Sequence, residues 1–381
     1  MKFPSYPRWG TMFACALWIL LASSARASSL TDLLLRPGPF GSGLAELDLE
    51  DTTRPTPPNG TFPGAPSRPL PTTVWYPAAD PAADEQPGAE VGRSARGFPL
   101  IVFGHGIALS GAEGSFVASH LAKHGYVVVA PDFPLSKGNA PGGPTATDIP
   151  GQARDVLFLT ELFQDPTFQM QFPPASSIDF DRIGLLGYSL GGATVALAGS
   201  DPSIDAVATL APAICPLLAL GETTHLDKPL LILQGTTDLV VPPAPNSQVL
   251  FDMSGRPKQL VTIENGSHGG FFTNALPLEA TLPPDMGIDS LLCQVLTPTL
   301  GTDPTAQTCG LCDPPTTGPQ VPVARQQDLT RAGVLAFFNG HLRCSLGSLA
   351  FLTLVYGRAN DELDSTFSGR FGQGLRECLV Q

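Results

Sequence analysis

Residues 181–192 read DRIGLLGYSLGG, and this stretch indicates the class of fold more strongly than any other. Residues 182–186 are apolar enough to form a buried strand, and the small residues at 190–198 favour a helix. Between them lies the pattern G-x-S-x-G, which requires a sharp strand–turn–helix with the hydroxyl of Ser189 exposed. Glycines are needed there because side chains would collide across the turn. The alternative is a glycine-rich turn with an incidental serine.

Strands and helices alternate on both sides of this stretch. Helical spacing is found at residues 114–124, 153–163, 190–198 and 327–341. Eight strands are expected, at residues 43–49, 72–76, 99–103, 126–130, 182–186, 205–210, 229–233 and 259–264. Such alternation predicts a mostly parallel sheet covered on both faces by helices. The fold class expected is therefore α/β, the α/β-hydrolase fold with an eight-stranded sheet.

The N-terminus has the pattern of a secretory signal peptide. Lys2 and Arg8 precede an uncharged, mostly apolar run at residues 12–22, and Ala25-Arg26-Ala27 supplies a small-x-small cleavage site. A membrane anchor is the alternative, but the run is short for a bilayer span. The sequence therefore predicts that residues 1–27 are removed, which leaves a secreted or periplasmic chain with no membrane anchor.

The remaining residues, 28–381, are expected to form one domain. Residues 269–323 interrupt the alternation and carry three cysteines, so they are interpreted as a cysteine-bearing insertion or flap. Residues 345–381 form a C-terminal tail that Cys344 and Cys378 would tie down.

The charge balance narrows the range of partners. The whole chain has a net charge of −13, and loss of the three cations of the signal peptide would make it −16. So acidic a surface disfavours nucleic acid and anionic membranes as partners. The chain is expected to be a monomer that acts on a small-molecule, lipid or polymer ester.

Six cysteines remain after the signal peptide, an even number that indicates up to three disulfides in an exported chain. They are Cys215, Cys293, Cys309, Cys312, Cys344 and Cys378. Fifteen pairings are possible, and the sequence does not choose among them. The Cys309-Gly-Leu-Cys312 motif is an alternative redox or zinc pair, but no second such motif or nearby histidine completes a zinc site. A structural disulfide role is favoured, and no metal or organic cofactor is expected.

A nucleophilic serine needs a base to take its proton and an acid to orient that base. In this fold the acid and then the histidine follow the serine, each at the end of a later strand. Asp238 ends the segment Gly235-Thr236-Thr237-Asp238 that follows the strand at 229–233, and His268 follows the strand at 259–264 in a glycine-rich loop. The other acids and histidines are less favoured because of their positions. Asp132 and His105 precede the serine, and Asp205, Asp227 and His225 lie at or before the start of a strand. His120, His124 and His341 lie on or at the end of a helix, and Glu264 is too close to His268 in the sequence.

Two backbone amides are expected to form the oxyanion hole. One is the amide of Leu190, next to the nucleophile. The other is assigned to Ile107, which follows the His105-Gly106 pair after the strand at 99–103. His105 is expected to hold this loop in shape rather than act as a base.

Phe271 and Phe272 follow the predicted base closely. One interpretation is that they line an apolar pocket for the acyl group. The other, equally favoured, is that they are ordinary core residues.

These motifs together resemble a known group, the secreted serine-type relatives of the dienelactone hydrolases. The group also includes platelet-activating-factor acetylhydrolases, chlorophyllases and bacterial cutinase-like polyester hydrolases. The matching segments are residues 73–77, 99–106, 124–132 and 181–192 and the loops of Asp238 and His268. The chain departs from the group in two ways. Dienelactone hydrolases themselves use a cysteine nucleophile, and many relatives have histidine where this chain has Tyr188.

The resemblance implies a secreted carboxylic ester hydrolase that works through a Ser-His-Asp triad and an acyl-enzyme intermediate. A lipase or phospholipid acetylhydrolase and a cutinase-like polyester hydrolase are alternatives within this chemistry. A serine peptidase is less favoured, because such peptidases usually carry a propeller or large cap domain. A hydrolase scaffold reused for binding is also less favoured, because all three triad residues are present.

Overall fold

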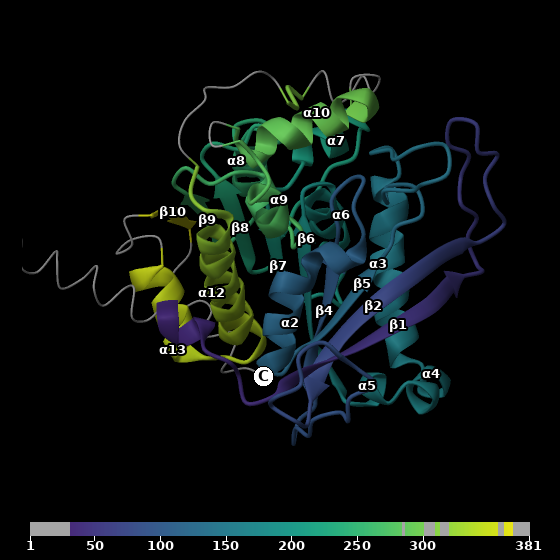
Figure 1. Cartoon of the computed structure of the whole chain (residues 1–381). Helices are drawn as coiled ribbons and strands as arrows, with labels where there is room; N and C mark the ends of the chain where they lie inside the picture. The colour runs from purple at the N-terminus through teal and green to yellow at the C-terminus, as the bar shows by residue number, and fades with distance from the viewer. Residues whose placement is uncertain (1–30, 284–285, 301–308, 313–319, 357–361, 369–381) are drawn as a thin grey trace, which may run out of the picture.

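The computed structural model describes residues 31–283, 286–300, 309–312, 320–356 and 362–368, arranged around a central sheet (Figure 1). Within these residues the sheet has ten strands, in the order β10-β9-β8-β7-β6-β4-β5-β2-β1-β3. All eight expected strands are present in the centre, and β3 and β10 extend the sheet at its edges. The strands are β1 (Gly41–Asp51), β2 (Arg68–Ala78), β3 (Gln86–Pro87), β4 (Phe98–Gly104), β5 (Val127–Pro131), β6 (Ile178–Tyr188), β7 (Ala206–Leu210), β8 (Leu230–Gly235), β9 (Lys258–Ile263) and β10 (Leu363–Ser368).

The middle of the sheet is parallel. Strands β5, β4, β6, β7, β8 and β9 run in one direction, whereas β2 is antiparallel to β1 and β5, and β10 is antiparallel to β9. Every residue of β4 is buried, as expected for a parallel strand covered on both faces. The carboxyl ends of β6, β8 and β9 therefore meet at the same edge of the sheet.

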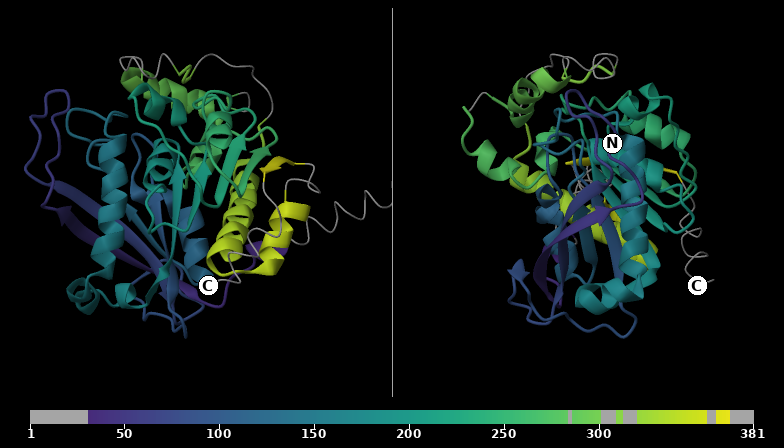
Figure 2. Two further views of the ribbon diagram at one scale, coloured as in Figure 1. Left: turned by 180° about the vertical axis from the view of Figure 1, so that it is seen from behind. Right: turned by 90° about the vertical axis from the view of Figure 1, so that its right-hand side faces the viewer.

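Helices cover both faces, and alternate side chains of β4 show why. Ile101 and Phe103 pack in the apolar cluster that includes residues of α2 and α12, whereas Leu100 and Val102 pack with α3 and α6. In Figure 1, α2 and α12 lie in front of the sheet, and Figure 2 shows α3 from behind. The four main helices are α2 (Ser115–Lys123), α3 (Ile149–Gln164), α6 (Leu190–Ala198) and α12 (Val323–Leu342). The expected α/β-hydrolase fold is confirmed.

Additional helices lie in the connections that the sequence pattern left unassigned. They are α4 (Pro166–Gln171), α5 (Pro173–Ser176), α7 (Ile214–Ala219), α8 (Ser247–Met253), α9 (Ala275–Glu279), α10 (Ile288–Leu300), α13 (Leu346–Ala350), η1 (Gly111–Gly114), η2 (Gly269–Phe271) and η3 (Phe351–Val355). Three of them, η2, α9 and α10, belong to the insertion. The tail supplies α13, which packs on α12, and β10, which pairs with β9.

The predicted signal peptide, residues 1–27, and Cys378 lie outside the described residues. Cys344 is disulfide-bonded. Among the helices that the structure describes, none has the length and apolar character needed to cross a membrane.

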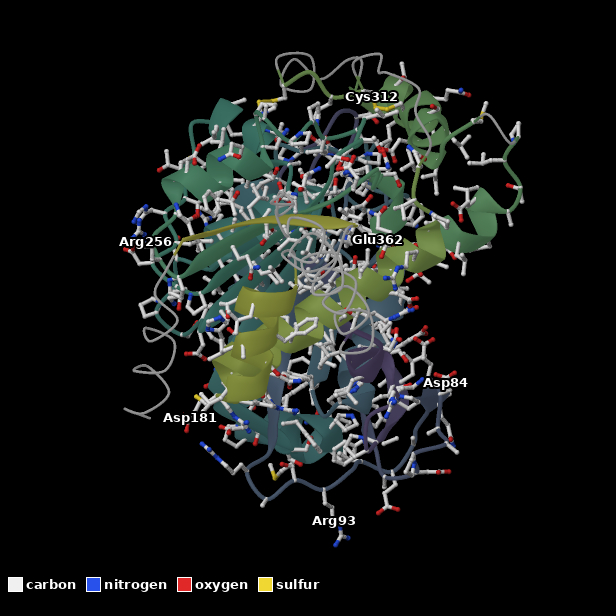
Figure 3. All side chains as sticks on the ribbon, turned by 90° about the vertical axis from the view of Figure 1, so that its left-hand side faces the viewer. Asp84, Arg93, Asp181, Arg256, Cys312 and Glu362 are labelled. Carbon is white, nitrogen blue, oxygen red and sulfur yellow. A yellow bond between two sulfur atoms is a disulfide. The ribbon has the colours of Figure 1, made fainter. Side chains whose placement is uncertain are left out.

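Two disulfides stabilise the insertion, one joining it to α7 and the other closing a loop within it. Cys215, in α7, bonds to Cys309, and Cys293, in α10, bonds to Cys312. Figure 3 labels Cys312 beside its disulfide. The two cysteines of the C-x-x-C motif therefore bond to different partners and not to each other. The expected disulfides are present, and the structure supplies the pairing that the sequence left open.

Removal of the two disulfides is expected to destabilise the protein unequally. The Cys215–Cys309 bond spans 94 residues, so chain entropy predicts that a double substitution to Ala lowers the free energy of unfolding by about 4–5 kcal/mol. The Cys293–Cys312 bond spans 19 residues, and the same change there is expected to cost about 3 kcal/mol. Urea unfolding of the two double variants measures both values. A larger loss at the shorter loop would contradict the entropic account.

Candidate active site

Ser189 lies in the turn between β6 and α6 and has an unusual backbone conformation. Its φ is 56° and its ψ is −119°, a region that non-glycine residues occupy only under strain. A Cβ at Gly187 would collide with the carbonyl oxygen of Gly191, and one at Gly191 would collide with that of Gly104. The turn therefore has the sharp geometry that the G-x-S-x-G pattern predicts.

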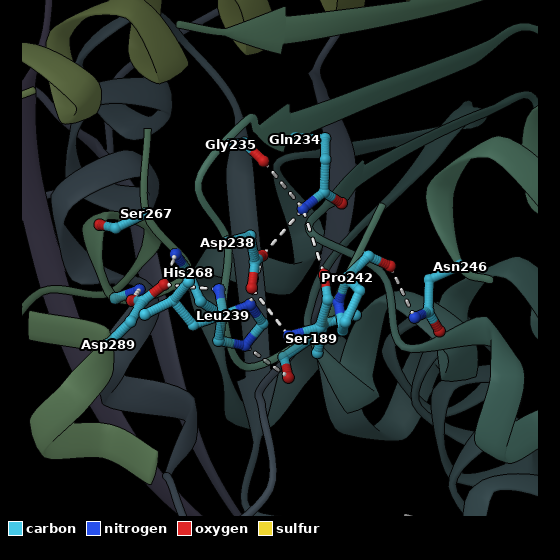
Figure 4. Close-up of polar contacts among 12 residues, drawn as sticks. Ser189, Gln234, Gly235, Asp238, Leu239, Pro242, Asn246, Ser267, His268 and Asp289 are labelled. Carbon is cyan, nitrogen blue, oxygen red and sulfur yellow. Dashed lines mark hydrogen bonds and ion pairs between the residues drawn. The ribbon is translucent and has the colours of Figure 1, made fainter. Parts of the chain in front are cut away.

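Three of the predicted site residues meet in one hydrogen-bonded chain (Figure 4). The Nε2 atom of His268 lies 3.0 Å from the Oγ of Ser189, and its Nδ1 lies 2.8 Å from Oδ2 of Asp238. Each residue follows a different strand, β6, β8 or β9. The three are nearly covered, with exposed fractions of 5% for Ser189 and Asp238 and 2% for His268. The structure thus brings together residues that are 79 and 30 positions apart in the sequence.

Further hydrogen bonds fix the carboxylate of Asp238. Oδ1 accepts from the backbone N–H of Val241 at 2.7 Å, and Oδ2 also accepts from the side-chain amide of Gln234 at 2.8 Å. Gln234 is fully buried in β8, which is otherwise apolar. Sequence reasoning missed this residue, although a lone polar side chain in a buried strand, four positions before the acid, was an available signal.

The protonation of His268 depends on opposing effects. Burial by itself lowers the pKa of its imidazole. The charge of Asp238, its hydrogen bond to the ring and the charge of Asp289 act in the opposite direction, and the pKa is raised above the ordinary value of 6.5. His268 is therefore a stronger base than a free histidine.

The loop that carries His268 is held from two sides. The hydroxyl of Tyr188 donates to the carbonyl of His268 at 3.1 Å, and the two rings lie 4.9 Å apart. From α12, the buried Gln326 accepts from the N–H of Ser267 at 2.9 Å and donates to its carbonyl at 2.7 Å. Tyr188 thus has a structural contact at the position where many relatives have histidine. Neither role was predicted from the sequence.

A second buried carboxylate, Asp289 of α10, lies beside the first. It accepts backbone N–H groups from Leu239, His268 and Gly269 and is completely buried. Burial, together with the charge of Asp238, raises the pKa of Asp289 to about 6.

Across the described part of the chain, no cluster of three or more His, Cys, Asp or Glu side chains suits a metal ion.

His105 holds the loop that faces the serine. Its Nδ1 donates to the carbonyl of Gly106 at 2.8 Å, and its Nε2 accepts the N–H of Phe133 at 2.9 Å. The ring is completely buried, and burial lowers its pKa, so the imidazole is neutral and forms one hydrogen bond through each nitrogen. A Cβ at Gly106 would lie 3.2 Å from the Cβ of Ser189, so the loop directly abuts the turn.

The amides of Ile107 and Leu190 are both available as donors. Among the described residues, neither N–H has a hydrogen-bond acceptor, although the next amide in the loop, that of Ala108, donates to Ser136. Leu190 is the first residue of α6, where the helix dipole favours negative charge. The arrangement suits an anionic oxygen bound next to Ser189.

Phe271 and Phe272 lie in the core. Phe271 is completely buried and Phe272 is 4% exposed, and both rings pack against Tyr188 at 6.4 Å. Their surfaces are occupied by other core side chains and leave no area on Phe271 for a ligand. The structure thus favours the core interpretation over the acyl pocket.

Fold and site together define an α/β-hydrolase with a serine, a histidine and a carboxylate in mutual contact. Residues 97–277, which include all three, match the family described as PET hydrolase-like. In structure, the chain is similar to a ferulic acid esterase from Streptomyces cinnamoneus, with a TM-score of 0.62 and 22% identity over 88% of this chain and 99% of that one. No curated protein matches in sequence. The family match supports the group that the motifs indicated, the serine-type relatives of the dienelactone hydrolases, and the structural match supports the fold.

Proposed function

We propose that this protein is a carboxylic ester hydrolase in which Ser189 is the nucleophile. The observation that best supports this function is the continuous hydrogen-bonded chain from Ser189 through His268 to Asp238. The amides of Ile107 and Leu190, which have no acceptor among the described residues, lie beside it. A base within reach of the hydroxyl, an acid that orients it and donors for an oxyanion are the parts that acyl transfer needs.

The first half of the reaction forms an acyl-enzyme. His268 Nε2 takes the proton of Ser189 Oγ as that oxygen attacks the ester carbonyl, and the negative charge moves to the carbonyl oxygen. The amides of Ile107 and Leu190 stabilise this oxyanion. The carbon–oxygen bond to the alcohol then breaks, and His268 donates its proton to the departing oxygen. Asp238 stays ionised and stabilises the imidazolium.

The second half releases the acid. Water enters in place of the alcohol, and His268 takes its proton as the water oxygen attacks the acyl carbon. The bond to Ser189 Oγ breaks, and His268 returns the proton to the serine. The reaction consumes one ester and one water, and Ser189 and His268 return to their starting states.

The class of substrate is inferred from the resemblances. A match to a PET hydrolase-like family and a fold neighbour named ferulic acid esterase both support esters of carboxylic acids, in small molecules or polymers. Lipid esters are the alternative within the same chemistry. The signal-peptide pattern of residues 1–27 and the disulfides support action outside the cytoplasm.

The test combines labelling with turnover. A fluorophosphonate probe is expected to modify one residue, identified as Ser189 by peptide mass spectrometry. A series of p-nitrophenyl esters of increasing chain length, assayed beside peptide p-nitroanilides, is expected to show ester turnover only. Absence of both label and ester turnover would reject the proposal, and peptide turnover alone would favour a peptidase.

The pH dependence follows from the state of His268. Because the neutral imidazole is the base and its pKa is raised above 6.5 by Asp238 against the effect of burial, kcat/KM is expected to fall as the pH decreases through a midpoint above 6.5. Activity is retained at higher pH. A pH profile with p-nitrophenyl acetate gives the midpoint. A midpoint below 6.5 would contradict the assigned environment.

A further inference from the structure

Asp289 joins the two loops that carry the acid and the base. Its Oδ2 accepts the N–H of Leu239 at 3.0 Å and that of His268 at 2.8 Å, and its Oδ1 accepts the N–H of Gly269 at 2.7 Å. Leu239 directly follows Asp238, whereas His268 and Gly269 belong to the loop after β9. One carboxylate therefore fixes both loops at once (Figure 4).

We propose, on the basis of the function proposed above, that Asp289 is a positioning residue that sets the distance between Asp238 and His268. Among the described residues, its carboxylate forms hydrogen bonds with backbone N–H groups and none with the imidazole ring. It acts through three backbone amides, and it is supplied by the insertion rather than by the alternating strands and helices.

The packing of α10 supports this role, because the helix is fixed against both loops. A Cβ at Gly269 would lie 2.8 Å from the side chain of Ile288, so the base loop packs closely on the first turn of α10. Leu296 is buried in a cluster with Val240 and Val241, which follow the acid. The Cys293–Cys312 disulfide anchors the same helix. Asp289 is therefore presented from a rigid element.

The charge of Asp289 has a second effect, which a purely structural role for this residue would not produce. The groups that face His268 are Asp238 from the β8 loop, Asp289 from α10 and the phenol of Tyr188 from β6. The negative charges of Asp238 and Asp289 both raise the pKa of His268. Loss of the charge at position 289 should therefore lower that pKa and move the acid limb of the pH profile to lower pH.

The test is Asp289→Asn, which keeps the size of the side chain. Its amide nitrogen cannot accept an N–H, so at least one of the three hydrogen bonds is lost. We expect kcat, measured per fluorophosphonate-labelled site, to fall roughly 10- to 100-fold through misplacement of the base, with KM changed less than about threefold. The acid limb of kcat/KM is expected to move to lower pH.

Asp155→Asn is the matched control. Asp155 is an equally buried carboxylate that pairs with Arg68 on the other face of the sheet. Its replacement is expected to lower the Tm while kcat per labelled site and the acid limb stay at wild-type values. If Asp289→Asn behaves in the same way, the positioning role is rejected.

Two further variants distinguish a failure of this inference from a failure of the proposed function. Loss of activity in Ser189→Ala with wild-type kinetics in Asp289→Asn would overturn this inference and leave the proposed function intact. Full activity in Ser189→Ala would reject both. If Asp289→Asn yields too little folded protein, Asp289→Glu keeps the charge but displaces it. It is then expected to lower kcat without moving the acid limb, and an unchanged kcat would overturn the inference.

Discussion

Replacement of Ser189 with Ala is expected to lower kcat for p-nitrophenyl esters by about 10⁶-fold and to abolish fluorophosphonate labelling. The methyl group has no oxygen to form the acyl-enzyme, so His268 loses the group whose proton it would take. The amides of Ile107 and Leu190 remain and would still stabilise an oxyanion formed by direct attack of water. A small residual rate above the uncatalysed reaction is therefore expected.

This substitution should leave the fold intact. Alanine keeps the Cβ of serine and removes only the hydroxyl, whose hydrogen bond within the described part of the chain is with His268. Ser200→Ala is the control, because Ser200 is an exposed serine at the end of α6. It is expected to retain wild-type kinetics. Ester turnover by Ser189→Ala at more than a few per cent of the wild-type rate would show that another residue is the nucleophile.

Asp238→Asn is expected to lower kcat by about 10⁴-fold. Oδ1 must still accept the N–H of Val241, so the amide nitrogen of Asn would take the place of Oδ2 and face His268 and Gln234. His268 would then have to accept a hydrogen bond at Nδ1 and carry its proton on Nε2. In that tautomer the ring cannot take the proton of Ser189. Steady-state assays above the acid limb measure the effect.

Asp205→Asn is the control for Asp238→Asn. Asp205 is a half-buried carboxylate that accepts the N–H of Ile183 at 2.8 Å, at the start of β7 and away from the site. Its replacement is expected to leave kcat unchanged. A fall of less than tenfold in Asp238→Asn would mean that His268 is oriented by other contacts, of which the backbone bond to Asp289 is the nearest.

The core of the candidate site could be predicted because it follows from local order. Ser189, Asp238 and His268 each come a few residues after an apolar run, and the carboxyl ends of parallel strands meet at one edge of the sheet. The same reasoning indicated Leu190 and Ile107 as candidate oxyanion donors, and their amides lie next to the serine and in the loop that abuts it. His105 was predicted to support that loop, and its two hydrogen bonds are consistent with this role.

The supporting residues could not be predicted, because their contacts join distant segments. Asp289 lies in a segment with no strand pattern, and Gln326 lies just before the predicted helix at 327–341. Their partners, His268 and Ser267, are 21 and 59 residues away. Phe271 and Phe272 illustrate the same limit, since an apolar residue next to a base is compatible with a pocket or with the core.

The sequence by itself determined the order of strands and helices and the sharp turn at Ser189, and it indicated Asp238 and His268 as the candidate acid and base. These depend on hydrophobic periodicity and on the sterics of glycine, which act between near neighbours in the chain. Only the tertiary structure decided the pairing of Cys215 with Cys309 and of Cys293 with Cys312, the place of β10 at the sheet edge and the contacts of Asp289. These depend on which segments meet in space, and hydrogen-bond partners far apart in the chain leave no periodic mark on the sequence.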